Sequence, residues 1–227
     1  MEDSRMGTAH ARRPLFRLPS GVFLILASTS PRRREMLDNW GIAYAAVSPP
    51  VEEPEPVSCD DPAEFTRRVA RLKAFSCLPP AVIGEAIGTS SASRTVIVAA
   101  DTVVSVGGTI LGKPEDERDA LNMLKRLSGR ESSVTTSLCL LVTDGAAVLD
   151  EVCLSDTAKV FFHPWEENVL AAYVATHECD DKAGAYAIQG QGAFLIRRIE
   201  GAWSTVVGLP VGLLAGELLS RGLIAPV

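Results

Sequence analysis

The chain has few of the residues that metal clusters and disulfide frameworks require. Its three histidines are scattered, and their separations do not match the spacing of zinc ligands. Its five cysteines are odd in number, widely spaced and without a C-x-x-C pair. We therefore expect structural or neutral roles for all eight residues, and reduced thiols in a cytoplasmic protein. The eight residues are His10, His163, His177, Cys59, Cys77, Cys139, Cys153 and Cys179.

Long apolar runs and an excess of positive charge are also missing. No apolar run approaches the ~20 residues needed to cross a bilayer, so we expect a soluble protein without a membrane partner. The net charge of −6 argues against a nucleic-acid polymer as partner, because such proteins usually carry a broad basic face. A small anionic ligand stays compatible if the positive charge gathers in one cleft. No G-x-G-x-x-G motif follows the first expected strand, which argues against a cofactor-dependent oxidoreductase.

What remains is a chain of 227 residues, 47% of them hydrophobic, which suffices for one large domain or two closely joined lobes. Residues 1–20 are polar, contain arginines and lack an apolar centre, so they do not read as a secretory signal. We expect them to form a flexible N-terminal extension. Residues 21–227 are then a single domain.

Hydrophobic periodicity predicts alternating strands and helices. Turn signals at Gly107-Gly108 and Asp144-Gly145 predict two hairpins, and the residues between Gly84 and Arg94 read as an exposed loop. This pattern indicates an α/β domain with a mixed sheet. The expected strands cover residues 22–26, 95–106, 109–111, 132–142, 147–162 and 193–199. The expected helices begin at Pro31, Pro62, Asp116, Pro164 and Pro210.

The most informative stretch is LASTSPRRR, residues 26–34. Ser30 is a natural N-cap and Pro31 a natural first helical residue, so an apolar strand runs directly into a helix start. Helix starts bind phosphate readily, and the forked guanidinium group of arginine suits phosphate oxygens. Two hydroxyls, of Ser28 and Ser30, and up to three guanidinium groups, of Arg32, Arg33 and Arg34, would surround such a phosphate. The alternative is an ordinary capped helix with a solvated basic first turn.

Asp101 lies within an almost continuously apolar strand. A carboxylate there is costly unless it is paired, binds a metal or emerges at the strand end, although it can also cap a backbone group. Gly112-Lys113-Pro114 presents a lysine from a stiff turn. Without further context, Lys113 reads equally well as a solvated surface residue.

Two further segments carry candidate residues. Residues 181–192, DKAGAYAIQGQG, form a loop in which Tyr186 could stack on a base and Gln189 could bond to a base edge. Loop tyrosines also pack on their own loop. Glu53 lies in a proline-rich segment, residues 49–56, that would present carboxylates on a stiff loop or act as a solvated linker.

Five motifs in order resemble the Maf family, the homologues of a septum-formation inhibitor, over residues 22–219. The motifs are Ser28-x-Ser30-Pro31-Arg32-Arg33, Ala100-Asp101-Thr102, Gly112-Lys113-Pro114, DKAGAY at residues 181–186, and VVGLP at residues 206–210. The resemblance implies a two-lobed α/β fold like that of inosine triphosphatases, with a long mixed β-sheet flanked by helices and a cleft between the lobes. It also implies a nucleoside triphosphate pyrophosphatase, dependent on Mg²⁺ or Mn²⁺, with a homodimer as a family-level expectation.

The family's roles fall on named positions of this chain. The resemblance makes Asp101 the proton acceptor for the attacking water and Glu53 an acidic position linked to metal or water, and both are candidate metal ligands. Whether Asp101 is chiefly a base or a metal ligand stays open. Arg32, Thr102 and Gln189 match positions of substrate choice. Ser28, Arg33, Lys73, Lys113 and Lys182 match the phosphate-contacting set.

The form Tyr186-Ala187-Ile188-Gln189-Gly190 resembles the subgroup that acts on dTTP and UTP. We therefore expect hydrolysis of these nucleotides to a monophosphate and pyrophosphate. The alternative is a nucleotide-binding regulator of cell division in which hydrolysis is vestigial. The chain departs from the family in its leader, in the insertion over residues 84–94 and in the third arginine, Arg34.

Overall fold

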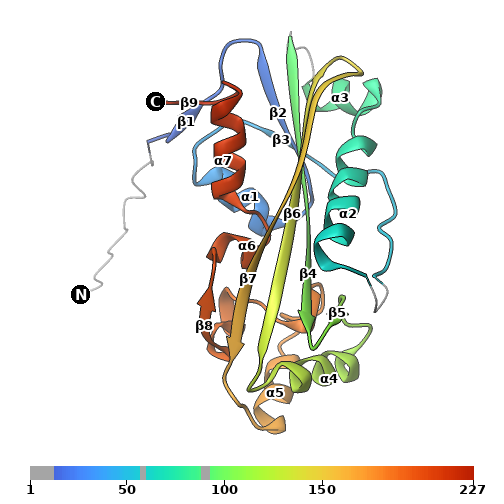
Figure 1. The fold of residues 1–227 in the computed structure, drawn as a ribbon, viewed down its shortest axis with the longest axis vertical. Helices are drawn as coiled ribbons and strands as arrows, with labels where there is room; N and C mark the ends of the chain where they lie inside the picture. Colours follow the sequence, from blue (N-terminus) through green and yellow to red (C-terminus); the bar gives the residue numbers. More distant parts are fainter. Residues whose placement is uncertain (1–12, 57–59, 88–92) are drawn as a thin grey trace, which may run out of the picture.

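The computed structural model describes residues 13–56, 60–87 and 93–227 (Figure 1). Its centre is a seven-stranded mixed sheet with the order β3-β2-β4-β6-β7-β8, and β5 pairs with β4. β2 runs parallel to both β3 and β4, whereas β4, β6, β7 and β8 pair antiparallel. The strands are β2 (Val22–Ala27), β3 (Ala45–Val47), β4 (Arg94–Val106), β5 (Thr109–Leu111), β6 (Glu131–Asp144), β7 (Ala147–Phe162) and β8 (Ile196–Glu200).

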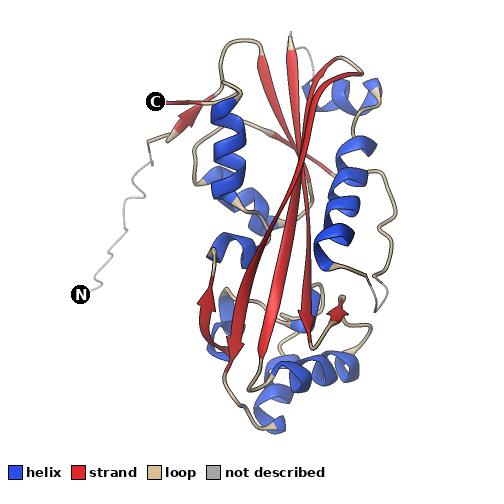
Figure 2. Ribbon diagram, viewed as in Figure 1, coloured by secondary structure: helices blue, strands red, loops and turns tan. Residues whose placement is uncertain are grey.

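Helices cover both faces of one half of the sheet (Figure 2). Successive residues of a strand point to opposite faces, so β4 places Val96 and Val98 in one core and Ile97 and Ala99 in another. The first core contains residues of α1 (Pro31–Asp38) and α7 (Val211–Ser220). The second contains residues of α2 (Pro62–Ser76) and α3 (Pro80–Ile87).

A third core lies at the other end of the long strands. It gathers apolar residues of α4 (Glu117–Leu127), α5 (Glu167–Val174) and the 3₁₀ turn η1 (Ala183–Ala185) around the ends of β4, β6 and β7. Figure 1 shows these helices gathered at one end of the molecule, away from α1, α2, α3 and α7. The structure confirms the expected two-lobed α/β architecture with a long mixed sheet. Separate groups of helices form the two lobes, and the same long strands run through both.

The structure differs from the expected loop and extension. Residues 84–87 belong to α3 rather than to a loop, and residues 88–92 of that loop lie outside the described part. Within the expected flexible extension, β1 (Phe16–Arg17) pairs with β9 (Ala225–Pro226), and Phe16 packs edge-on against Trp40. The extension therefore contains an ordered strand before residue 20.

Two other elements begin at residues different from the predicted ones. α5 begins at Glu167 rather than Pro164, and β8 begins at Ile196 because residues 190–195 form the 3₁₀ helix η2 (Gly190–Leu195). The short helix α6 (Trp203–Val207) and the strand β3 have no counterpart among the expected elements. In the described ranges, no helix has both the length and the apolar character needed to cross a membrane.

Candidate active site

A cavity of about 530 Å³ lies between the two halves of the molecule. This volume is within the usual range for small-molecule sites. Its walls come from the β2–α1 turn, the segment after β3 that carries Glu53, α2, β4, the turn after β5 and the residues on both sides of η1. Of the ten predicted site residues, nine line it: Ser28, Arg32, Arg33, Glu53, Lys73, Asp101, Thr102, Lys113 and Lys182.

The turn from β2 into α1 forms one wall. Ser30 occupies the N-cap position and Pro31 begins the helix, as predicted, but the Ser30 side chain makes no capping hydrogen bond. The Ser28 hydroxyl instead accepts a hydrogen bond from the Ser30 backbone N–H at 3.2 Å and another from Arg33 Nη1 at 3.3 Å. Ser28 is therefore a fixed, buried acceptor that orients the arginine.

Arg33 joins three distant parts of the chain. Its Nε donates to the Gly208 carbonyl oxygen at 2.7 Å, and its Nη2 donates to Thr102 Oγ1 at 3.1 Å. Gly208 has φ of +118°, and a Cβ there would lie 3.3 Å from Thr102 Oγ1, so glycine suits this close approach. Burial lowers the pKa of Arg33, and the charges of Asp101 and Glu53 oppose that effect. The guanidinium plane is thus fixed at the cavity wall.

Lys73 lies between the two predicted catalytic carboxylates. Its Nζ is 2.8 Å from Asp101 Oδ1 and 2.9 Å from Glu53 Oε2. The Lys73 side chain is 6% exposed and that of Asp101 10%, so the pair satisfies the expectation that a carboxylate in this strand must be paired. Burial raises the pKa of Glu53, but the hydrogen bond and charge of Lys73, with Lys113 and Arg33, outweigh it and hold that pKa below its ordinary value.

Two further lysines line the opposite wall. Lys113 follows β5, and the Gly112 carbonyl of that turn accepts the Gly184 backbone N–H at 2.9 Å. Lys182 pairs with its neighbour Asp181, and its side chain is 14% exposed. The backbone bond between the turn and the loop therefore fixes both lysines to the same side of the cavity.

Two residues of the predicted base-recognition loop lie differently in the structure. Tyr186 packs edge-on against Phe162, with ring centroids 4.9 Å apart, and is 6% exposed, although it also lines the cavity. Its ring therefore packs within the protein, which is the alternative to base stacking that the sequence left open. Gln189 is half-buried and is not among the residues that line the cavity, although its neighbour Ile188 is.

Two residues that the sequence did not single out as site residues hold this loop in place. The Tyr173 hydroxyl oxygen accepts the Ala187 backbone N–H at 3.1 Å. The Glu178 carboxylate accepts the backbone N–H groups of Gln191 at 2.9 Å and Gly192 at 2.7 Å. Tyr173 is one of the buried residues of α5, and no local pattern marks Glu178, because its partners are backbone groups thirteen and fourteen residues away.

The carboxylates suit a hard divalent cation held jointly with a ligand. Asp101 Oδ1 and Glu53 Oε2 both approach the Lys73 ammonium, so they already converge on one positive group. Mg²⁺ is commonly bound by one or two carboxylates together with phosphate oxygens. Two protein carboxylates beside clustered lysines and arginines fit that mode better than a cage made by the protein alone.

Fold and cavity together define an α/β protein whose cavity gathers cations from both halves around Asp101 and Glu53. The comparisons specify the family. Residues 23–221 match the model of the Maf-like protein family, and the chain belongs to that family.

Related proteins cover nearly the whole chain. A dTTP/UTP pyrophosphatase from Nitratidesulfovibrio vulgaris is 43% identical, covering 88% of this chain and 89% of the relative. A protein of the same name from Oleidesulfovibrio alaskensis is 40% identical, covering 89% and 87%. Among solved structures, a HAM1 protein from Coxiella burnetii superposes with a TM-score of 0.44 at 14% identity, covering 88% of this chain and 99% of that one.

Proposed function

We propose that the chain is a nucleoside triphosphate pyrophosphatase that hydrolyses dTTP and UTP to the monophosphate and pyrophosphate. The observation that carries the proposal is the Lys73 ammonium between Asp101 and Glu53, inside a cavity that Arg33, Lys113 and Lys182 also line. Relatives named dTTP/UTP pyrophosphatase, 43% and 40% identical, support the choice of substrate. We also propose that the protein is cytoplasmic, where such nucleotides are found.

The cations would bind and orient the triphosphate. Catalysis of phosphoryl chemistry depends mainly on positioning and on stabilising negative charge. Arg33 presents its guanidinium from a wall that three hydrogen bonds fix, while Lys113 and Lys182 approach from the other half. A chain of phosphates held between these groups would have the bond to be broken close to Asp101.

Asp101 and Glu53 would supply the acidic chemistry. A divalent cation bound by these two carboxylates would neutralise phosphate charge and help to activate water. Asp101, which pairs with Lys73, would accept the proton of the attacking water or help to hold the cation. Lys73 fixes the two carboxylates at a common point and lowers the pKa of Glu53, which keeps the Glu53 carboxylate charged.

Substrate choice would rest on Arg32 and on the loop through Ile188, which line the cavity. Thr102 matches a position of substrate choice, and its Oγ1 accepts a hydrogen bond from Arg33 Nη2 and lies 3.0 Å from Thr136 Oγ1. Thr102 would therefore contribute by positioning Arg33. Gln189 would act through the conformation of the loop rather than from the cavity wall.

A substrate panel tests the proposal. Purified protein is given dTTP, UTP, CTP and GTP with Mg²⁺ or Mn²⁺, and nucleotide products are separated while pyrophosphate is measured with added inorganic pyrophosphatase. We expect dTTP and UTP to give the monophosphate and pyrophosphate, and chelation of the metal to stop turnover. Nucleoside diphosphate as the first product would refute the cleavage site. Tight nucleotide binding without turnover would instead support a regulator.

A further inference from the structure

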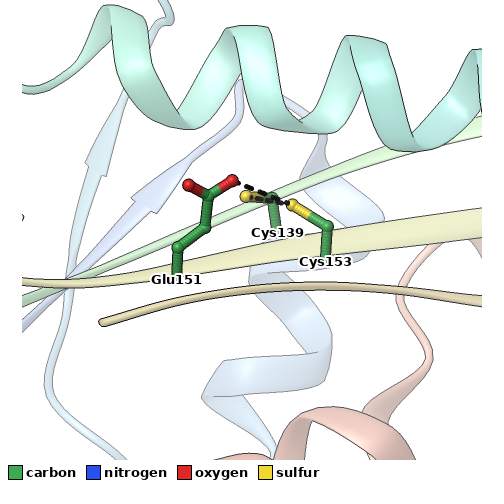
Figure 3. Close-up of side chains that lie close together, drawn as sticks. All are labelled: Cys139, Glu151 and Cys153. Atoms are coloured by element: carbon green, nitrogen blue, oxygen red, sulfur yellow. Dashed lines mark hydrogen bonds between the residues drawn. The ribbon is translucent and has the colours of Figure 1, made fainter.

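A second cluster of reactive side chains lies on the sheet face that α2 covers, outside the cavity. Cys139 of β6 and Cys153 of β7 are directly opposed in the antiparallel register, and Glu151 lies two residues before Cys153 (Figure 3). The potential ligand atoms of these three residues lie within 4.8 Å of one another. They take no part in the proposed hydrolysis.

The two thiols are placed for bond formation. Their Sγ atoms are 2.6 Å apart, and both cysteines are free. Directly opposed residues of antiparallel strands have Cα atoms about 4.5 or 5.5 Å apart. Disulfides span Cα separations of about 4.4–6.8 Å, so the register alone satisfies this requirement. A bond between the sulfur atoms therefore needs little backbone movement.

The surroundings make the two thiols unequal. Cys139 is fully buried against α2, whereas Cys153 is partly exposed. The hydrogen bond with Cys139 lowers the pKa of Cys153. The same contact, together with burial, raises the pKa of Cys139. Cys153 is thus the thiol that ionises first and that solvent reaches.

A cation lies beside the pair. Arg71 of α2 donates from Nε to Glu151 Oε1 at 2.5 Å and from Nη2 to Oε2 at 3.3 Å. Its guanidinium also lies over the Phe75 ring, 4.2 Å from the centroid. The charges of both thiols contribute to raising the pKa of Arg71, after the hydrogen bond and charge of Glu151. Arg71 is therefore close enough to stabilise a thiolate.

We propose that Cys139 and Cys153 are a redox pair that closes to a disulfide when a hydroperoxide oxidises Cys153. The Cys153 thiolate attacks one peroxide oxygen and the O–O bond breaks, giving a sulfenic acid and, after protonation, water. The Cys139 sulfur then attacks the Cys153 sulfur, an S–S bond forms, and the sulfenic oxygen leaves as a second water with the Cys139 proton. Two thiols are oxidised, and one hydrogen peroxide is reduced to two waters.

Such a cluster could instead bind a metal ion, but its geometry favours a redox pair over a metal site. The sulfur atoms are in direct contact, leaving no space between them for an ion at Zn–S distances of about 2.3 Å. Glu151, the third donor, is already bound by Arg71. The test therefore includes Zn²⁺ as a competing arm.

The experiment uses the full chain with Cys59, Cys77 and Cys179 replaced by alanine, so that the pair supplies the only thiols. After addition of hydrogen peroxide, we expect both thiols to disappear together, a cross-linked peptide containing residues 139 and 153, and full recovery on reduction with dithiothreitol. If this variant does not fold, peptide mapping of the native sequence gives the same readout. Separate oxidation of each thiol, without a cross-link, would overturn the proposal.

Single variants test the order of events. In Cys139→Ser, Cys153 should give a sulfenic acid that dimedone traps, whereas Cys139 in Cys153→Ser should react at least about tenfold more slowly. Arg71→Gln should slow the oxidation and Arg71→Lys should restore it. Arg67→Gln is the matched control, because Arg67 lies one turn earlier on α2 and contacts Ser155 of β7. Equal rates in the two cysteine variants, or protection from peroxide by one equivalent of Zn²⁺ alone, would contradict the redox pair.

Discussion

The two sides of the cavity are built in different ways. On one side, charged groups project from regular elements and fix one another: Lys73 from α2 reaches Asp101 on β4, and Arg33 from α1 reaches Thr102. On the other side, Lys182 and Ile188 lie on a loop whose backbone is held by Gly112, Tyr173 and Glu178. The first side has its geometry set by side chains that would also contact the phosphates. The geometry of the second side depends on residues that lie behind the loop and hold its backbone, such as Tyr173 and Glu178.

This difference separates two kinds of mutational effect. Changes on the side built from regular elements remove charges that would act on the transition state, so they should lower kcat. Changes behind the loop leave every charge in place and alter only where the loop lies, so they should act mainly on KM and on the choice of base. The predictions below test that separation, from the largest expected effect to the smallest.

Asp101→Asn should lower kcat by about 10²–10⁴, because the variant lacks a proton acceptor of suitable basicity. The fold should persist, since asparagine has nearly the same shape. Steady-state kinetics with dTTP, together with thermal unfolding, provide the measurement. Asp150→Asn is the control, because Asp150 on β7 forms a surface ion pair with Arg221 at the end of α7, and the substitution should leave kcat unchanged. Near-normal turnover by Asp101→Asn would remove this residue from the chemistry.

Arg33→Lys should lower kcat/KM about tenfold or more, even though the charge is retained. A lysine ammonium cannot reproduce the fork that bonds Ser28, Thr102 and the Gly208 carbonyl at once. The loss is read from initial rates with dTTP as a change in transition-state binding. Arg126→Lys, on the exposed surface of α4, controls for the substitution itself. Full activity of Arg33→Lys would show that charge alone matters at this position.

Tyr173→Phe should raise KM severalfold with a smaller change in kcat, and should narrow the preference for dTTP over CTP. The Ala187 N–H would lose its acceptor, and an unpaired buried N–H costs about 1–3 kcal/mol. Kinetics with both nucleotides and the Tm provide the readouts.

Tyr186→Phe is the matched control for stability. In the described part of the chain, the buried Tyr186 hydroxyl has no hydrogen-bond partner, so its removal should not lower the Tm. Equal destabilisation by the two tyrosine variants would show that the Tyr173 hydroxyl does not hold the loop.

Lys113→Met should raise the pKa of Glu53, because the Lys113 charge is one of the causes that lower it. A carboxylate whose pKa is depressed on folding stabilises the protein above its unfolded pKa, and this contribution is lost as the pH falls through the folded pKa. The loss should therefore begin at higher pH in the variant. NMR titration of the Glu53 carboxyl carbon measures the shift, and Lys125→Met, which removes a surface partner of Glu167, should not change it.

The sequence predicted the charged side of the cavity better than the loop. A buried carboxylate needs a partner, and a strand that enters a helix presents its N-terminus, so the placement of Asp101 and Ser28 follows from local rules. The position of the Tyr186 ring does not follow from any local rule. Its ring packs against Phe162, a contact between residues far apart in the chain that only the folded β7 supplies.

Short elements were missed for a related reason. β3 and β1 have three and two residues, too few for a periodic pattern, and they form because β2 and β9 offer backbone partners. α3 contains Gly84 within a small-residue segment, and its Ile83 is buried in the core under α2. Tertiary packing outweighed local propensity there.

The long strands have one more consequence. β4, β6 and β7 have 13, 14 and 16 residues and run through both halves, and the register irregularities of β6 and β7 fall near strand ends rather than midway. The halves therefore share one stiff spine and cannot swing as separate bodies on a linker. Any tightening around a bound nucleotide would come from twisting of these strands or from movement of the two loops that line the cavity, within residues 49–56 and 181–188.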